Sequence, residues 1–161
     1  MPVTSDITAT YRGPGRVMVR LLAMGPREDR ALAFLMAFCL VAFVAQLPGL
    51  ARKSHIQGLD LDMQMGGALM GSVFLMPLLL YVLAGFSHVV ARVFGGQGDW
   101  YGARLALFWS LLASTPLLLL NGLVAGFIGQ GPALQGVGLL WCGVFLWFWV
   151  SSLRTAERAA P

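Results

Sequence analysis

The chain has 161 residues, the length of one domain. Hydrophobic residues make up 58% of it and charged residues only 11%, whereas soluble domains carry about 25% charged residues. Because so few charges could not cover a soluble fold, and because the apolar residues form long runs, the composition excludes an ordinary soluble domain and predicts an integral membrane protein. The net charge of +4 comes from basic residues beside those runs, which indicates membrane topology and no nucleic-acid partner.

Residues 1–30 are expected to form a cytoplasmic N-terminal arm, with its first nine residues poorly ordered. Pro14 suits the first turn of a helix, and apolar residues recur at helical spacing from Val17, with Arg16 and Arg20 on the other side. This pattern predicts a short amphipathic helix in the membrane interface. A disordered basic arm is the alternative.

Residues 31–161 are expected to form a transmembrane domain with four spans. None of the spans contains Asp, Glu, Lys or Arg, and they are predicted at residues 31–51, 66–91, 105–128 and 136–153. The shortest would be about 27 Å long, close to the thickness of the hydrocarbon core. The polar residues 52–65 are expected to be an extramembrane loop. Because no cleavage site follows it, the first run is expected to be retained.

Six small or helix-bending residues inside the spans predict how the helices pack. Two pairs of glycines four residues apart would let another helix approach closely, within the bundle or between chains. Two prolines each remove a backbone hydrogen bond, which predicts kinks, and hydroxyls beside the second proline are expected to satisfy nearby backbone groups. These six residues are Gly67, Gly71, Gly122, Gly126, Pro77 and Pro116.

Basic residues divide unequally between the two sides of the predicted membrane. The N-terminal arm, the connection between the second and third spans, and the C-terminal segment carry nine, while the opposite side carries only Arg52 and Lys53. By the positive-inside rule, both termini and that connection are predicted to be cytoplasmic. Residues 154–161 are expected to be a short charged tail.

The connection between the second and third spans, Gly95–Gly102, contains four glycines in eight residues. Its backbone amides could form an anion-binding nest, to which nearby arginines would add charge for a lipid phosphate. The favoured interpretation is a tight helix connection with its aromatic residues at the lipid headgroups, since a lone glycine-rich match is weak evidence. The candidate lipid or partner contacts are Arg16, Arg20, Arg92, Gly95, Gly96, Gly98, Tyr101 and Arg104.

Catalytic and metal-binding motifs are not visible in the sequence. His88 is the only ionisable imidazole in a span. We interpret it as an interfacial or helix–helix residue, with a functional group as the alternative, because no partner lies one turn away. His55 with Asp60 and Asp62 is interpreted as part of a solvated loop, not a metal site. We therefore expect no enzyme activity, no cofactor and no metal.

Residues around the glycine segment form a specific pattern. It consists of Arg92-Val93-Phe94-Gly95-Gly96-Gln97-Gly98, followed by Tyr101, residues 103–110 and Thr115-Pro116. A double glycine, a third glycine, and then a span with a small polar residue before proline resemble the core of the Yip-domain family of polytopic membrane proteins. The Pro14 segment is similar to the family's lead-in. The family typically has five spans, whereas four are predicted here.

The resemblance supports an all-α fold, a compact bundle of four transmembrane helices with a short interfacial N-terminal helix and both termini cytoplasmic. The compact, arginine-biased chain is similar to the bacterial branch, which implies a multi-pass inner-membrane protein. The longer N-terminal region that links eukaryotic members to small GTPases of vesicle traffic is not evident.

We expect a non-enzymatic scaffold or accessory subunit that contacts membrane lipids, other membrane subunits or a second copy of itself. The alternative is a small transporter or channel for an apolar or lipid-like solute, because the prolines could break helices around a site. A lipid-modifying enzyme is a third idea, which lacks any visible nucleophile or metal set.

Overall fold

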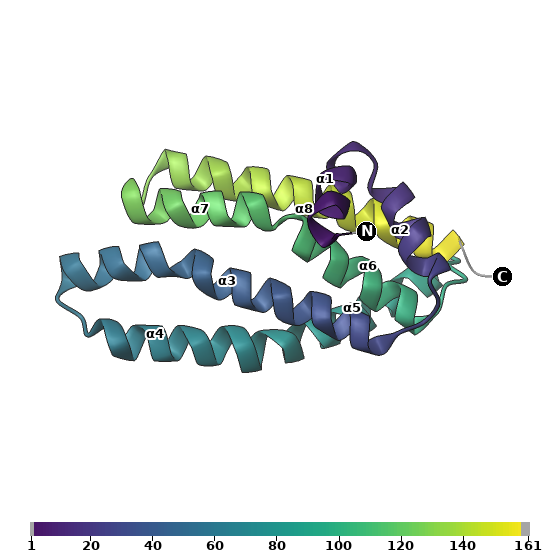
Figure 1. The fold of residues 1–161 in the computed structure, drawn as a ribbon, viewed down its shortest axis with the longest axis horizontal. Coiled ribbons are helices and arrows are strands. Elements are labelled where there is room, and N and C mark those ends of the chain that lie inside the picture. Colours follow the sequence, from purple (N-terminus) through teal and green to yellow (C-terminus); the bar gives the residue numbers. More distant parts are fainter. Residues whose placement is uncertain (1, 159–161) are drawn as a thin grey trace.

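The computed structural model describes residues 2–158, and in this part of the chain the regular elements are all helices, without strands (Figure 1). Helix accounts for 87% of the structure, which confirms the predicted all-α class. The elements are α1 (Val3–Arg12), α2 (Pro14–Ala23), α3 (Glu28–Gln57), α4 (Leu61–Met70), the π-helical turn η1 (Gly71–Leu75), α5 (Met76–Val93), α6 (Trp100–Ala113), α7 (Thr115–Phe127) and α8 (Pro132–Arg158).

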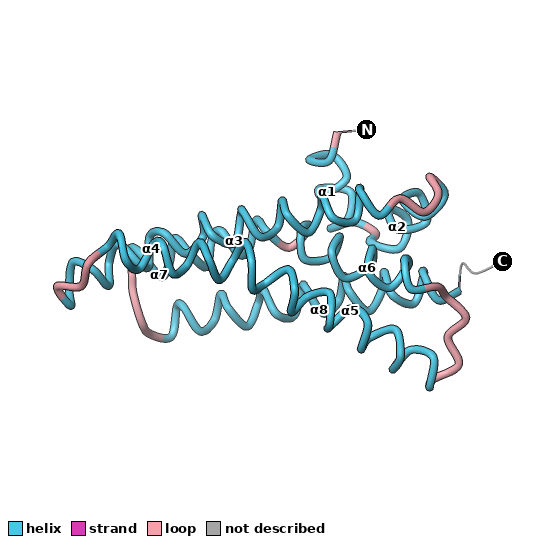
Figure 2. Tube along the Cα trace, turned by 90° about the horizontal axis from the view of Figure 1, so that it is seen from below, coloured by secondary structure: helices cyan, strands magenta, loops and turns pink. Residues whose placement is uncertain are grey.

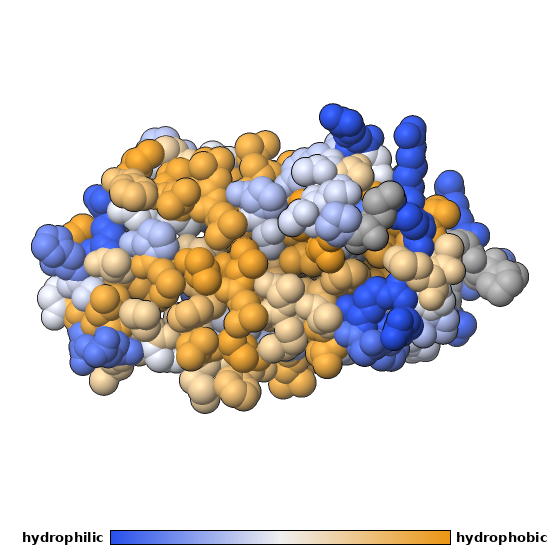
Figure 3. Space-filling view, viewed as in Figure 1, coloured by the Kyte–Doolittle hydropathy of each residue, from blue (hydrophilic) through white to orange (hydrophobic). Residues whose placement is uncertain are grey.

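Three helical stretches in the described residues are long and apolar enough to cross a membrane. They are α3, the continuous run Leu61–Val93 and α8. The pair α6 and α7 passes the same test together, although it is bent by 46°, so the chain has three candidate spans, or four if the bent pair is one. Figure 3 shows apolar residues covering the middle of one face and hydrophilic residues gathered towards both ends, as expected for helices running across a membrane.

The bend between α6 and α7 has a local cause. Pro116 has no backbone N–H and leaves the carbonyl of Leu112 without its helical donor. The hydroxyl of Thr115 donates to that carbonyl at 2.7 Å, and the hydroxyl of Ser114 donates to the carbonyl of Leu111 at 2.8 Å. The hydroxyls beside the proline therefore bond to the backbone carbonyls of the preceding turn, as the sequence led us to expect.

A second proline, Pro77, lies just after a π-helical turn, and the helix is not broken there. Directly before Pro77, the N–H of Met76 bonds to the carbonyl of Gly71, five residues back. This wider turn shifts the hydrogen-bond ladder by one residue. The helix continues through it, and Leu61–Val93 remains one candidate span.

The helices extend well beyond the apolar runs, so the prediction of a loop at residues 52–65 was wrong. Helix α3 continues to Gln57 and α4 begins at Leu61. Between them, Gly58 adopts φ +64°, and the Asp60 carboxylate caps α4 by accepting a backbone N–H two residues on. Hydropathy marks the apolar core of a span, whereas capping residues set the helix ends.

The N-terminal residues are helical too, in contrast to the expected poorly ordered start. Helix α1 contacts α6, and α2 contacts α8. Both helices use their buried residues for this, Thr10 in α1 and Val17, Met18 and Leu21 in α2. The apolar face of the predicted amphipathic helix therefore packs against the protein itself.

The core is centred on α6, in which every residue except Trp100 and Arg104 is buried. Phe34 meets Trp109 edge-on with ring centroids 5.0 Å apart, and Tyr81 meets Phe108 at the same distance. The Leu61–Val93 run is the opposite case, because only 11% of its most apolar window is buried. Helix α6 is thus the interior helix, while this long run faces outward.

Close backbone contact joins α7 to α3. A Cβ atom placed on Gly122 would overlap the carbonyl of Ala45, and one on Gly126 would overlap Pro48. Side chains larger than hydrogen at these two positions would force the helices apart.

The other glycine pair faces open space in this single chain. A Cβ on Gly67 or on Gly71 would meet nothing within 4 Å. The same stretch exposes large apolar side chains, with Phe74 67%, Leu78 63% and Val82 65% accessible. This face is suited to lipid tails or to a second membrane helix.

Most helix connections lie towards the two ends of the molecule, whereas the bend between α6 and α7 lies near its middle (Figure 1 and Figure 2). At the glycine-loop end lie α1, α2, the α5–α6 connection and the end of α8. At the hairpin end lie the turns between α3 and α4 and between α7 and α8. The structure thus brings together the three segments that carry most of the basic residues.

Candidate functional site at the glycine-loop end

The glycine loop between α5 and α6 folds around a carboxylate from the far end of the chain. Gly95 adopts φ +87°, a left-handed conformation that favours glycine. The N–H of Gly96 then bonds to the carbonyl of Ala91 at 2.9 Å and closes α5. The N–H of Gly98 donates to Oε2 of Glu157 at 2.8 Å. The loop therefore holds the last turn of α8.

Two of the loop glycines are needed for this close fit. A Cβ on Gly96 would overlap the Glu157 carboxylate and lie 2.9 Å from the carbonyl of Ala91, and one on Gly98 would lie 2.9 Å from Glu157 Cδ. The N–H of Gln97 also points to the carbonyl of Glu157, at 3.4 Å. The loop therefore does bind an anionic group through a backbone amide, but in this structure that group is the carboxylate of Glu157 from the same chain.

His88 lies beneath the same carboxylate. Its side chain is fully buried, and Nδ1 lies 3.4 Å from Oε1 of Glu157, within ion-pair distance. The Trp100 ring covers it, with ring centroids 4.3 Å apart. Within the described residues, neither ring nitrogen makes a hydrogen bond of good geometry. His88 therefore connects α5 to α8, in line with its interpretation as a helix–helix residue.

Sequence reasoning missed Glu157, because it placed this residue in a charged tail. Helix α8 in fact continues to Arg158. The partner of His88 lies far away in sequence, so no spacing rule could find it. Of the predicted tail, residues 159–161 lie outside the described part of the chain.

The remaining loop candidates differ in accessibility. Arg92 is exposed, whereas Tyr101 is only 6% exposed. Arg104 is half-buried and forms an ion pair with Glu28 at the start of α3. The Arg104 charge is thus already engaged, and Arg92 is the loop-side arginine that faces outward.

A cationic hollow lies beside the loop end, between α1 and α2. It encloses about 600 Å³. Three arginines at spacings of four residues, two hydroxyls and a tyrosine line it, and the full lining is Ser5, Thr8, Ala9, Tyr11, Arg12, Gly13, Arg16, Val17 and Arg20. Such a combination of charge and hydroxyl groups can bind an anion.

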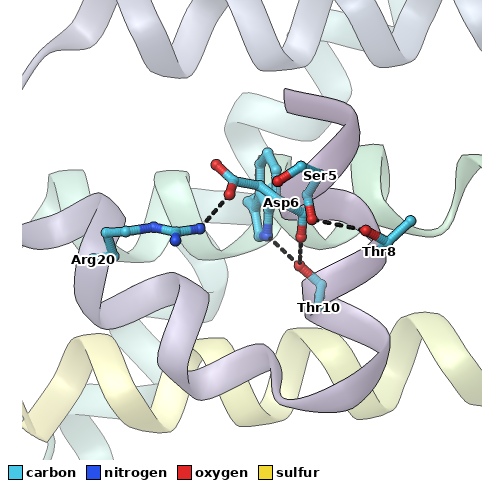
Figure 4. Close-up of polar contacts among 6 residues, drawn as sticks. Ser5, Asp6, Thr8, Thr10 and Arg20 are labelled. Carbon is cyan, nitrogen blue, oxygen red and sulfur yellow. Dashed lines mark hydrogen bonds and ion pairs between the residues drawn. The ribbon is translucent and has the colours of Figure 1, made fainter. Parts of the chain in front are cut away.

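One of the three arginines is already paired inside the protein. Figure 4 shows Arg20 of α2 reaching back to Asp6 of α1. Thr10 donates to the Asp6 carbonyl at 2.7 Å and accepts the indole N–H of Trp109 at 3.1 Å. This network fixes α1 and α2 to each other and to the buried helix α6.

The other two arginines of the hollow, Arg12 and Arg16, are exposed and have no carboxylate within 4.0 Å in the described residues. Tyr11 lies beside them, and burial raises the pKa of its hydroxyl. Within the described residues this hydroxyl is buried and makes no hydrogen bond. Its ring is held edge-on against Phe148 at 4.9 Å. Two exposed arginines without a carboxylate partner therefore lie in one hollow.

Among residues 2–158, no group of three or more His, Cys, Asp or Glu side chains is arranged to hold a metal ion. The chemistry that this end offers is the recognition of anionic groups by Arg12, Arg16 and Arg92. A lipid phosphate or an acidic protein segment carries such groups.

Comparison with known proteins identifies a family for nearly the whole chain. The family model described as the Yip1 domain matches residues 9–160. The match includes α2, the glycine loop and the Glu157 segment, and it confirms the resemblance seen around the glycine loop. No curated protein and no solved structure matches the chain significantly.

Proposed function

The chain belongs to the Yip1 domain family of membrane proteins, and from this premise we propose that it is a non-enzymatic scaffold or accessory subunit. Its glycine-loop end binds anionic lipid headgroups and an acidic segment of a partner protein. The bundle has four transmembrane helices, with the bent pair α6–α7 as one span. The α2 helix lies at the level of the membrane interface with its apolar face on the protein, and both termini face the cytoplasm of a bacterial cell.

The observation that carries this proposal is the pair of unpaired arginines on a firmly held surface. Arg12 and Arg16 line the hollow between α1 and α2, while Asp6 neutralises Arg20 next to them. Since the Thr10–Trp109 bond anchors this surface to the core, the backbone that carries the arginines is already ordered, and binding has to order only their side chains.

Copurification in mild detergent tests the partner role. The double substitution Arg12→Gln and Arg16→Gln should lower the recovery of a copurifying membrane protein, whereas Arg154→Gln combined with Arg158→Gln, an equal charge change at exposed positions of α8, should not. Equal recovery with all three forms, or a wild-type protein that is always partnerless, would contradict the proposal.

Cysteine labelling in intact cells tests the orientation. Gln57→Cys at the hairpin end should react with an impermeant maleimide, and Arg154→Cys at the glycine-loop end should react only after the membrane is opened. The reverse result would place the termini on the other side.

A small transporter for a lipid-like solute is the second candidate. A cavity of about 790 Å³ at the hairpin end favours it. Flux across vesicles that contain the purified protein would distinguish transport from binding alone.

A further inference from the structure

A groove runs along the contact between α3 and α7, away from the glycine loop. It encloses about 790 Å³, within the usual range for small-molecule sites. Helix α5 contributes Met76 and α8 contributes Trp141 to its walls. On α3 the lining extends from Phe38 to Gln57, which is about 28 Å along a helix axis. The groove is therefore long and narrow.

Small side chains leave this volume unfilled. Where α3 and α7 touch, the lining consists of alanine and glycine, with Ala42, Ala45 and Gly49 on α3 and Gly122 and Ala125 on α7. These residues let the two backbones approach, but they do not fill the space beside the contact. The deeper walls are mostly apolar and include two polar side chains, Gln46, whose amide bonds to the Ala42 carbonyl and the Ser72 hydroxyl, and Asn121. The apolar part of the interior suits a hydrocarbon chain.

The mouth of the groove is cationic. Arg52 lines it and donates to the carbonyls of Gly126 and Phe127 at 3.3 Å each, which holds its guanidinium over the last turn of α7. Lys53 also lines the mouth and is exposed. Asp60 and Asp62 at the same end are not part of the lining, and the Asp60 carboxylate caps α4.

We propose that this groove binds one acyl chain of an anionic phospholipid, with the lipid phosphate between Arg52 and Lys53. The occupant combines a hydrocarbon chain for the apolar walls with a negative charge for the mouth. It comes from the leaflet opposite to the one at the glycine-loop end. The site is separate from the surface at Arg12 and Arg16. An experiment can therefore contradict one of the two proposals without contradicting the other.

Native mass spectrometry of the detergent-purified full chain tests this site. Palmitoyl-oleoyl phosphatidylglycerol should be retained as one bound lipid in preference to the phosphatidylcholine with the same chains. Glycerol 3-phosphate, which has the charge without a chain, should not displace it. Equal retention of the two phospholipids would overturn the proposal.

Two matched substitutions locate the lipid. Lys53→Gln should weaken phosphatidylglycerol binding about fivefold, the effect of one lost basic residue, whereas Arg154→Gln at the other end should not. Ala125→Phe should fill the groove and abolish retention, whereas Ala51→Phe, on exposed α3 outside the lining, should leave it intact. A folded Ala125→Phe protein that still retains the lipid, or a Lys53→Gln protein with wild-type preference, would contradict the site. If Ala125→Phe does not fold, the Lys53→Gln result decides.

Discussion

The helix interior is filled differently at the two ends of the molecule. At the glycine-loop end, large residues of α6 such as Phe108 and Trp109 fill the interior, and Glu157 and Asp6 are bonded to other elements. At the hairpin end, α7 presents glycine and alanine to α3, and a groove remains open. Side-chain volume at the helix contacts therefore decides which end has a filled helix interior and which end keeps a groove between its helices.

The bend at Ser114 makes this difference possible. It divides one predicted span into α6, which is buried on nearly all sides, and α7, which packs on α3 and α8 and exposes its outer face. A straight span would have given both halves similar surroundings. The proline and its hydroxyl neighbours thus separate a structural half from a half that lines the groove.

The largest loss of stability is expected from the Glu157→Ala substitution at the closed end. It leaves His88 and the N–H of Gly98 buried without their partner, and removal of one member of a buried pair costs about 3 kcal/mol. Unfolding in detergent, followed by circular dichroism, would measure the free energy. Glu157→Gln keeps an acceptor for Gly98 and should lose clearly less. Equal losses would show that the hydrogen bond to Gly98 contributes little and that the loss comes from the carboxylate charge.

At the open end, Gly122→Ala should lower the free energy of unfolding by about 2 kcal/mol, because the added methyl group meets the backbone of Ala45 and separates the helices. Gly143→Ala in α8 is the matched control. Nothing lies within 4 Å of a Cβ there, so helix propensity alone should stabilise it slightly. If both substitutions act alike, the α3–α7 contact is looser than the structure indicates.

A smaller effect is expected where α1 joins the core. Trp109→Phe removes the indole N–H that bonds to the Thr10 hydroxyl, which should cost about 1 kcal/mol. Thr10→Val removes the same bond from the other side, and the double variant should lose less than the sum of the two single losses. Simple additivity would indicate that this bond does not couple the two helices.

The smallest effect on unfolding is expected from Gly67→Ala on the outward face, within about 0.5 kcal/mol, since the position is open in the single chain. Cross-linking of the protein in membranes provides the second measurement. We expect the substitution to lower the yield of dimers, because the added methyl group would keep a second copy at a distance. Unchanged dimer yield would show that lipid, not protein, covers this glycine pair.

The sequence by itself determined the membrane class, the helical fold, the hydroxyls that serve the carbonyl before Pro116 and the family-specific pattern around the glycine loop. These properties depend on composition and on residues that are close along the chain. Local rules also supplied the glycine pairs, although they could not say that Gly122 meets α3 while Gly67 meets nothing.

Only the tertiary structure decided what the glycine loop binds and where the free charge and the open space lie. The partner of His88 is Glu157, the partner of Arg20 is Asp6, and the groove forms between α3 and α7. Each joins residues from different helices, and hydropathy and spacing do not encode which helices become neighbours. The loop glycines illustrate this point, because their sequence allowed an anion site and the fold supplied a carboxylate of its own.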